Sequence, residues 1–338
     1  MRKFRVGITA DVLRSDGLPI FGKEVLGLLD NSPLVEWEYM QQPSIDVTPE
    51  QAARYDALCA MTTRVTASSL VGPDRRLKLI ARFGVGYDSI DVAACNRAGV
   101  LLTIAPDGVR RPVATSALTF VLMLAQQVLI KDRLTRAGRW SEKMDYIGIG
   151  LTGRTLGSIG IGNIGAELFR LAKPFDMRFI AHDPIADPAV AAAIGVQLVD
   201  MDTLFRESDF LTVNCPLTER TRGLVSARLL GLMQPGAYLI NTARGPIVDE
   251  AALIAALKAG KIAGAALDVF EEEPVNPDNP LLALDNVVVT PHGICFTDEC
   301  MRRLAESAFR ATLEVAAGRK PPYIVNPEAL PVALAPQR

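Results

Sequence analysis

The sequence of 338 residues lacks the features that mark several classes of protein. It has no basic excess, since 36 Lys and Arg stand against 38 Asp and Glu without a basic cluster, which argues against a nucleic-acid partner. It has no long apolar run, because the most apolar window, residues 117–130, is too short for a bilayer and contains two glutamines. No signal peptide follows the basic start. We therefore expect a soluble, cytoplasmic protein with no membrane partner.

Cysteine and histidine are also scarce. The five cysteines form no CxxC pair, and their odd number is typical of reduced thiols rather than of a disulfide framework. His292, Cys295 and Cys300 have no fourth ligand at a spacing typical of zinc, so we predict no metal site. The only other histidine is His182. An imidazole that takes part in catalysis therefore has two candidate positions.

Short β-branched runs alternate with longer, alanine-rich amphipathic stretches along most of the chain. This pattern predicts an α/β protein with parallel sheets and helices on both faces. With 49% hydrophobic residues, the chain is long enough for about two domains. The predicted strands of the first domain are FRVGITA, ALCAMTT, LKLIARFG and GVLLTIA. Those of the second domain are TLGSIGIG, RFIAHDP, FLTVNCP, AYLINTA, GAALDVF and NVVVTPH.

Two predicted helices bear on how the domains are connected. Residues 113–129 are apolar nearly all round, which suits burial between domains or against another subunit. Residues 297–317 form a charged amphipathic helix after the last strand, and either helix could cross between the domains. We therefore expect a discontinuous first domain, residues 1–107 and 296–338, with a second domain, residues 108–295, inserted into it. The last ten residues are expected to form a loose tail.

A glycine pattern in the second domain predicts a dinucleotide site. Gly160, Gly162 and Gly165 have the GxGxxG spacing between an apolar strand and a helix. The first glycine allows the tight bend, the second lets the backbone approach a diphosphate, and the third allows close packing of helix on strand. Asp183 ends the next strand, where a carboxylate accepts hydrogen bonds from ribose hydroxyls and repels a 2′-phosphate. Because Pro184 rather than an arginine follows it, we expect NAD rather than NADP.

Polar residues follow three further strands of the second domain. Arg244 ends AYLINTA, Asp268 and Glu273 lie in GAALDVFEEEP, and His292 ends NVVVTPH. Ligands of open parallel sheets bind beyond the carboxyl ends of the strands, so these side chains are expected to converge. An arginine and a carboxylate beside a dinucleotide site make His292 a candidate proton carrier.

These motifs resemble those of a known family. GxGxxG, NTARG, LDVFEEEP and TPH, with ARFGVGYDSIDV in the first domain, are similar to the D-isomer-specific 2-hydroxyacid dehydrogenases, which include phosphoglycerate dehydrogenases and glyoxylate/hydroxypyruvate reductases. The resemblance extends from about residue 50 to 325. It implies two Rossmann-like or flavodoxin-like domains with the cofactor domain inserted, a cleft active site, NAD as cofactor and a homodimer.

The resemblance also implies roles for individual positions. Arg244, Glu273 and His292 match the catalytic residues, and Val85 and Gly86 match backbone donors to the substrate carboxylate. The positions that match the cofactor site are Gly160, Gly162, Asn163, Ile164, Gly165, Asp183, Cys215, Pro216, Thr221, Thr242, Ala243 and Asp268.

The chemistry of a 2-oxo acid explains these residue types. Its carboxylate must be held while hydride reaches the adjacent carbonyl carbon, and the guanidinium of Arg244 would hold it in a fixed geometry and polarise the carbonyl. Hydride addition leaves an alkoxide, to which His292 would donate a proton, while Glu273 would orient the imidazole and favour its charged form. The implied reaction interconverts a small 2-oxo acid and a D-2-hydroxy acid, with the nicotinamide carrying the hydride.

Several residues depart from the commonest family pattern and concern the substrate. Thr115 stands where many members have glutamate. Phe296 follows the histidine where small residues are frequent, so we expect it to shape the substrate pocket. Arg64, Arg110 and Arg111 are candidates for binding a second acidic group on the substrate.

Two alternative functions stay open at this point. A non-enzymatic, NAD-sensing corepressor-like scaffold has the same fold, but a pure binder needs no proton carrier such as His292. A formate dehydrogenase typically pairs the histidine with glutamine, whereas this chain has Glu273. Phosphite dehydrogenase, in the same superfamily, is harder to distinguish by sequence.

Overall fold

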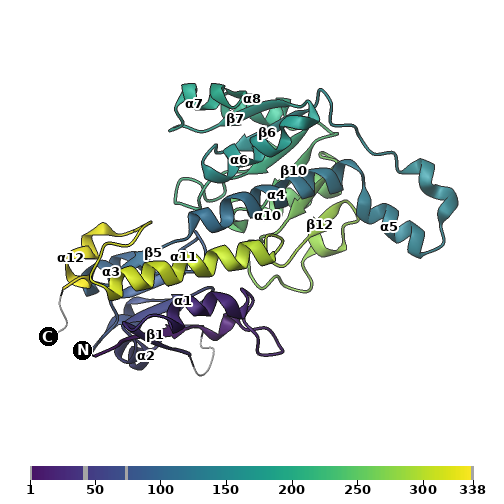
Figure 1. Ribbon diagram of the computed structural model, residues 1–338. Coiled ribbons are helices and arrows are strands. Elements are labelled where there is room, and N and C mark those ends of the chain that lie inside the picture. The colour runs from purple at the N-terminus through teal and green to yellow at the C-terminus, as the bar shows by residue number, and fades with distance from the viewer. Residues whose placement is uncertain (1, 41–44, 73–74, 336–338) are drawn as a thin grey trace. The chain divides into compact units, whose positions relative to one another are not determined.

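The computed structural model describes residues 2–40, 45–72 and 75–335, which form two compact α/β units (Figure 1). Each unit has its own parallel sheet, with five strands in the first and seven in the second. The fold class predicted from the alternating sequence pattern is therefore confirmed.

Unit 1 comprises Met1–Pro112 and Phe296–Arg338. Its strand order is β2-β1-β3-β4-β5, the flavodoxin-like order of doubly wound sheets. The strands are β1 (Phe4–Ile8), β2 (Val35–Tyr39), β3 (Ala57–Ala60), β4 (Leu79–Arg82) and β5 (Leu101–Thr103). The helices are α1 (Gly27–Asp30), α2 (Pro49–Arg54), α3 (Val92–Ala98), α11 (Asp298–Ala316) and α12 (Leu330–Ala333). Helix α11 packs on β3 and β4, so the two chain segments share one core.

Unit 2 comprises Val113–Cys295. Its strand order is β12-β11-β10-β9-β6-β7-β8, which is the Rossmann order with one further strand. The strands are β6 (Thr155–Ile159), β7 (Arg178–His182), β8 (Val196–Leu198), β9 (Phe210–Val213), β10 (Tyr238–Asn241), β11 (Gly264–Leu267) and β12 (Val287–Val289). The helices are α4 (Pro106–Ala125), which begins before the unit boundary, α5 (Val128–Arg136), α6 (Asn163–Ala172), α7 (Pro188–Ala193), α8 (Met201–Glu207), α9 (Ala227–Leu230) and α10 (Glu250–Lys258).

The strands of unit 2 are buried on both faces. Along β10, Tyr238 and Ile240 belong to one apolar layer and Leu239 belongs to the other, because successive side chains of a strand point to opposite faces. Phe120 of α4 packs in the first layer, and Leu253 of α10 packs in the second. Helices therefore cover both faces and leave the ends of the strands for ligands.

Two strands were not predicted from the sequence, and both lie at a sheet edge. Strand β2 has the sequence VEWEY, in which apolar and acidic residues alternate, and β8 has three residues, one of them polar. An edge strand has a neighbour on one side alone, so it need not carry the continuous apolar run of a central strand. The sequence pattern is weakest at these two positions for that reason.

The predicted helix over residues 113–129 is wrong in extent. Helix α4 begins at Pro106 and ends at Ala125, and Gln127, with a φ of 52°, separates it from α5. The axes of α4 and α5 differ by 58°. Among the described residues, no single helix is long and apolar enough to cross a membrane, and this bent pair alone meets that test by length and composition.

The predicted loose tail is also wrong as far as residue 335. Helix α12 lies in that segment, and its Ala333 is buried. Just before it, Val325 donates a backbone hydrogen bond to Leu102 of β5, and Ile324 forms an antiparallel bridge with Thr103. The C-terminal segment thus covers the open edge of the unit 1 sheet, which would otherwise expose unpaired backbone groups.

Candidate active site

The candidate residues of unit 2 lie at the edge of its sheet that is formed by the carboxyl ends of the strands. The strand order reverses between β6 and β9, and ligands of open parallel sheets bind outside such a switch point. Each candidate follows a strand: the glycine turn follows β6, Asp183 follows β7, Cys215 and Pro216 follow β9, Arg244 follows β10, Asp268 and Glu273 follow β11, and His292 follows β12.

The glycine turn requires glycine at its first and third positions. Gly160 has a φ of 94°, and a Cβ there would lie 3.0 Å from the carbonyl oxygen of Asn214. A Cβ on Gly165 would lie 2.4 Å from the carbonyl oxygen of Gly160, so α6 packs directly against the turn. These two glycines bring the start of α6 to the end of β6.

The second glycine leaves space at the start of α6. A Cβ on Gly162 would have no neighbour within 4 Å, and Gly162 caps α6 without a side-chain hydrogen bond. The next two residues, Asn163 and Ile164, begin the helix, whose N-terminal amides attract an anion. An open position beside a helix N-terminus fits the diphosphate of a dinucleotide.

Asp183 ties the end of β7 to this turn. Its Oδ2 accepts a hydrogen bond from the backbone N–H of Ile161 at 3.0 Å, and its Oδ1 accepts one from Ile185 at 3.0 Å. Burial, with a smaller effect of the Asp183 charge, raises the pKa of the Cys215 thiol to about 11. The Cys215 side chain is therefore a neutral thiol close to the carboxylate of Asp183.

The loop after β9 is shaped by its own hydroxyl groups. Thr221 Oγ1 donates to the carbonyl oxygen of Pro216 at 2.7 Å and accepts from the backbone N–H of Thr218 at 2.7 Å. Thr221 was predicted at the cofactor site, and these contacts show how its side chain fixes the conformation of the loop at that edge.

Arg244 lies in a turn held by a buried asparagine. Asn241 accepts a hydrogen bond from the N–H of Ala243 at 3.0 Å and donates one to the carbonyl oxygen of Arg244 at 2.9 Å. Arg244 Nη1 donates to the carbonyl oxygen of Ala243 at 2.7 Å, and Thr242 lies between. Sequence analysis missed Asn241, although an asparagine two residues before a turn is a signal for this arrangement.

Glu273 and His292 are in direct contact. Oε2 of Glu273 lies 2.7 Å from Nδ1 of His292, and its Oε1 accepts the backbone N–H of Phe270 at 2.9 Å. Burial alone would raise the pKa of Glu273, but these hydrogen bonds and the charges of His292 and Arg244 outweigh it, so the pKa is lowered. Glu273 is therefore a carboxylate at neutral pH. It orients the imidazole and directs Nε2 away from itself.

Asp268 holds the segment around His292. This buried residue accepts three hydrogen bonds at Oδ1, from the hydroxyl of Thr290 at 2.6 Å and from the N–H groups of Gly293 at 2.9 Å and Ile294 at 3.1 Å. The backbone of His292 between them has a φ of 49°, in the left-handed region. Asp268 was predicted at the cofactor site, and its observed contacts stabilise the turn that presents the histidine.

The remaining candidates belong to unit 1. Val85 and Gly86 follow β4 at the carboxyl edge of that sheet and are partly buried. Arg64 is exposed and forms two hydrogen bonds with Asp46, at 2.6 and 3.2 Å. Phe296 is 53% exposed and directly precedes α11 and its cap. Arg110, Arg111 and Thr115 lie on α4 and are exposed. The two arginines were candidates for binding a second acidic group, and Thr115 departs from the family pattern.

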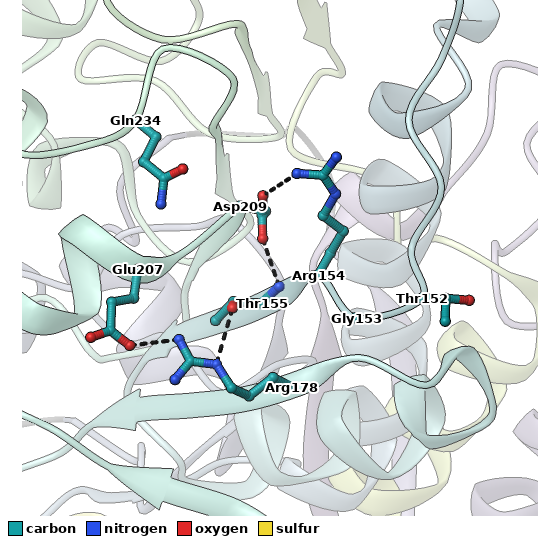
Figure 2. Close-up of a pocket in the computed structure, with 8 residues that line it drawn as sticks. All are labelled: Thr152, Gly153, Arg154, Thr155, Arg178, Glu207, Asp209 and Gln234. Atoms are coloured by element: carbon teal, nitrogen blue, oxygen red, sulfur yellow. Dashed lines mark hydrogen bonds and ion pairs between the residues drawn. The ribbon is translucent and has the colours of Figure 1, made fainter.

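Unit 2 also has a hollow in its surface away from these residues. This polar hollow has a volume of about 440 Å³ and lies at the edge where β6, β7 and β9 begin, opposite the glycine turn. Figure 2 shows the side chains that line it. Its arginines are already paired, Arg154 with Asp209 at 2.9 Å and Arg178 with Glu207 at 2.6 Å. Asp209 also accepts the N–H of Thr155 at 2.7 Å. These contacts fasten neighbouring strands, and no unbalanced charge marks a ligand site.

His182 and the cysteines form no metal centre. His182 Nδ1 lies 3.0 Å from the carbonyl oxygen of Val199, so this ring supports the edge of the sheet. None of the five cysteines forms a disulfide bond. Within the described ranges, no three His, Cys, Asp or Glu side chains lie close enough together to hold a metal ion.

Similar proteins agree with this arrangement of motifs. Residues 118–293 match the family described as D-isomer specific 2-hydroxyacid dehydrogenase, NAD binding domain. A glyoxylate reductase of Korarchaeum cryptofilum is 38% identical over 88% of this chain and 90% of its own length. A D-3-phosphoglycerate dehydrogenase of Archaeoglobus fulgidus is 42% identical over 74% of this chain and 47% of its own length. An acyclic imino acid reductase in complex with NADPH and D-Arg superposes with a TM-score of 0.81 at 26% identity, over 94% of this chain and 99% of that one.

Proposed function

The chain belongs to the D-isomer specific 2-hydroxyacid dehydrogenase family, and from this premise we propose that it reduces a small, unphosphorylated 2-oxo acid to the D-2-hydroxy acid with NADH. One observation carries the proposal, namely the 2.7 Å contact between His292 and Glu273 with the charge of Arg244 acting on the same carboxylate. A proton donor and an anion-binding group thus stand together at the edge of the sheet where dinucleotides bind in this fold.

Each residue has a distinct role in the proposed reaction. Arg244 binds the substrate carboxylate and polarises the adjacent carbonyl, and the backbone N–H groups of Val85 and Gly86 are proposed as further donors to that carboxylate. A bound nicotinamide supplies the hydride. As the new C–H bond forms, His292 gives its ring proton to the carbonyl oxygen. Glu273 stabilises the imidazolium before this transfer and keeps the ring oriented.

We propose NADH rather than NADPH as the reductant. Asp183 is held in place by two backbone N–H groups, so its charge cannot easily move away from a 2′-phosphate. Like charges in contact cost several kcal/mol, so NADH should be preferred at least tenfold in kcat/KM. Asp183→Ser should reduce that preference while kcat with NADH stays similar. An unchanged preference would show that another group sets cofactor specificity.

Two observations support an unphosphorylated substrate. Arg64, a candidate for binding a second acidic group, is already paired with Asp46. Several similar proteins are named glyoxylate reductase. We therefore propose glyoxylate or hydroxypyruvate as the substrate.

The decisive experiment is a substrate panel with both reduced cofactors. Oxidation of NADH should follow the addition of glyoxylate, hydroxypyruvate or a longer 2-oxo acid, and phosphorylated acids should be poor substrates. Tight NADH binding without turnover of any of these compounds would instead favour the sensing scaffold. Oxidation of phosphite as the fastest reaction would assign the chain to phosphite chemistry.

We further propose that two copies of the chain form a homodimer through the segment 128–150, called the arm here. Within unit 2, the arm extends away from the sheet (Figure 1). It exposes large apolar side chains, with Trp140 at 66%, Met144 at 68% and Ile147 at 71%. Apolar surface of this kind is typical of a protein interface. The family resemblance supports a second copy as the partner, and the cytoplasmic location stays a prediction from the sequence.

A further inference from the structure

A glutamate behind the candidate active site fastens the loop that carries Glu273. Oε2 of Glu250 accepts the backbone N–H of Glu271 at 3.0 Å, and its Oε1 accepts the side-chain amide of Asn279 at 2.7 Å. The two oxygens of one carboxylate thus hold two points of the loop between β11 and β12, on either side of Glu273. Hydrogen bonds to a charged acceptor are about twice as strong as neutral ones.

The same glutamate is joined to the Arg244 turn. Glu250 is the first residue of α10, and five residues separate it from Arg244. Within this segment the backbone of Gly245 packs against that of Phe270, because a Cβ on Gly245 would lie 1.8 Å from the carbonyl oxygen of Phe270. The turn that presents Arg244 and the loop that presents Glu273 therefore meet along their backbones, and Glu250 bonds them together.

Helix α10 has an N-cap that does not involve this side chain. Asp249 already caps the helix, because its carboxylate accepts the N–H of Ala252 at 2.9 Å. The hydrogen bonds of the Glu250 carboxylate with Glu271 and Asn279 run to the loop and not to its own helix. A glutamate in a first helical turn usually interacts favourably with the helix dipole alone. Here its carboxylate also accepts hydrogen bonds from a distant segment.

We propose that Glu250 is a positioning residue for the Glu273–His292 pair. This inference rests on the proposed function, in which that pair delivers the proton. Phe270 links the two effects, because its backbone N–H donates to Glu273 Oε1 and the adjacent N–H of Glu271 donates to Glu250. With Glu250 in place, the carboxylate of Glu273 stays within hydrogen-bonding distance of the imidazole; without it, the loop moves and the imidazole loses its fixed orientation.

The first test is steady-state kinetics with glyoxylate and NADH. Glu250→Ala should lower kcat about tenfold to a hundredfold, because a displacement of about 1 Å at the reacting groups has effects of this size. The KM for glyoxylate should change by less than about threefold, since Asn241 holds Arg244 independently. Glu250→Gln and Asn279→Ala, which each lose part of the contact, should give intermediate kcat values. Glu207→Ala, which removes a carboxylate paired with Arg178 at the opposite sheet edge, is the matched control and should leave kcat unchanged.

A double-mutant cycle separates positioning from a general loss of structure. If Glu250 acts through Glu273, Glu250→Ala should cost about twofold or less in a Glu273→Gln background. Equal effects of Glu250→Ala in both backgrounds would overturn the proposal, and so would a kcat equal to that of the parent protein.

A second readout does not depend on turnover. Hydrogen exchange followed by mass spectrometry should show faster exchange over residues 270–279 in Glu250→Ala and not in Glu207→Ala. Unchanged exchange would overturn the proposal even if the parent protein reduces no 2-oxo acid. If Glu250→Ala shows the faster exchange and the parent protein reduces none of these acids, the proposed function is refuted and Glu250 remains the residue that fastens the loop.

Discussion

His292 combines a side chain suited to proton transfer with a backbone conformation that few residues adopt. Its φ of 49° lies in the left-handed region, where asparagine is among the most tolerated residues. His292→Asn should therefore keep the turn held by Asp268 while it removes the proton donor. We expect kcat to fall by on the order of a hundredfold or more and the Kd for NADH to stay the same, measured by turnover and by titration of NADH fluorescence.

The other histidine of the chain offers a matched control. His182→Asn removes an imidazole that lies against the carbonyl of Val199, and kcat should stay within about twofold of the parent value. Full turnover by His292→Asn, or equal losses in the two variants, would refute the assignment of His292 as the proton donor.

The lowered pKa of Glu273 leads to a prediction about pH. Its hydrogen bonds to His292 and Phe270 favour the charged form, so the carboxyl should titrate below its usual value of 4.5. A carboxyl whose pKa is lower in the folded than in the unfolded state stabilises the fold above the unfolded pKa, and this contribution is lost as the pH falls. The carboxyl resonance of Glu273, followed by NMR, should move with a midpoint below pH 4.5. A midpoint above that value would mean that burial outweighs the contacts with His292.

At the scale of secondary-structure elements, substitutions at two glycines in the junction of β6 and α6 should affect stability and NADH binding differently. Gly165→Ala places a methyl group 2.4 Å from the carbonyl oxygen of Gly160, so α6 must move. We expect a loss of about 1–3 kcal/mol in the free energy of unfolding, together with weaker NADH binding. Thermal unfolding and NADH titration measure the two effects.

Substitution at the middle glycine should have a different outcome. A methyl group on Gly162 meets no atom of the protein within 4 Å, so Gly162→Ala should leave the Tm unchanged within about 1 °C. The same methyl group would occupy the space proposed for the diphosphate, and the Kd for NADH should rise by about tenfold or more. Unchanged NADH affinity in Gly162→Ala would place the cofactor elsewhere.

At the scale of the whole molecule, the proposed homodimer leads to a prediction about the arm. Trp140→Glu combined with Met144→Glu places charge on surface that the proposed homodimer buries, and such desolvated like charges cost several kcal/mol across an interface. Sedimentation at micromolar concentration should show a dimer for the parent protein and a monomer for this variant. Val71→Glu, at a residue 57% exposed in unit 1, is the control and should stay dimeric. A monomeric parent protein would refute the proposal.

The α/β class and the central strands were predictable because their signals are local. A run such as AYLINTA is mostly apolar because β10 has neighbours on both sides and helices on both faces, and β6 and β9 are also central strands of the sheet. The edge strands β2 and β8 lack that burial and were missed. The break at Gln127 was missed as well, because a single left-handed residue leaves the apolar pattern on both sides of it intact.

By itself, the sequence determined that an arginine, acidic residues and a histidine each follow the end of a parallel strand beside a glycine turn, because order along the chain and strand direction together place them at one sheet edge. The family resemblance had already selected Glu273 among three consecutive glutamates. Only the tertiary structure decided that Asp46 pairs with Arg64 and that Glu250 reaches the loop after β11. Hydrogen bonds between residues distant in sequence depend on how the loops pack against one another, and no local pattern encodes that packing.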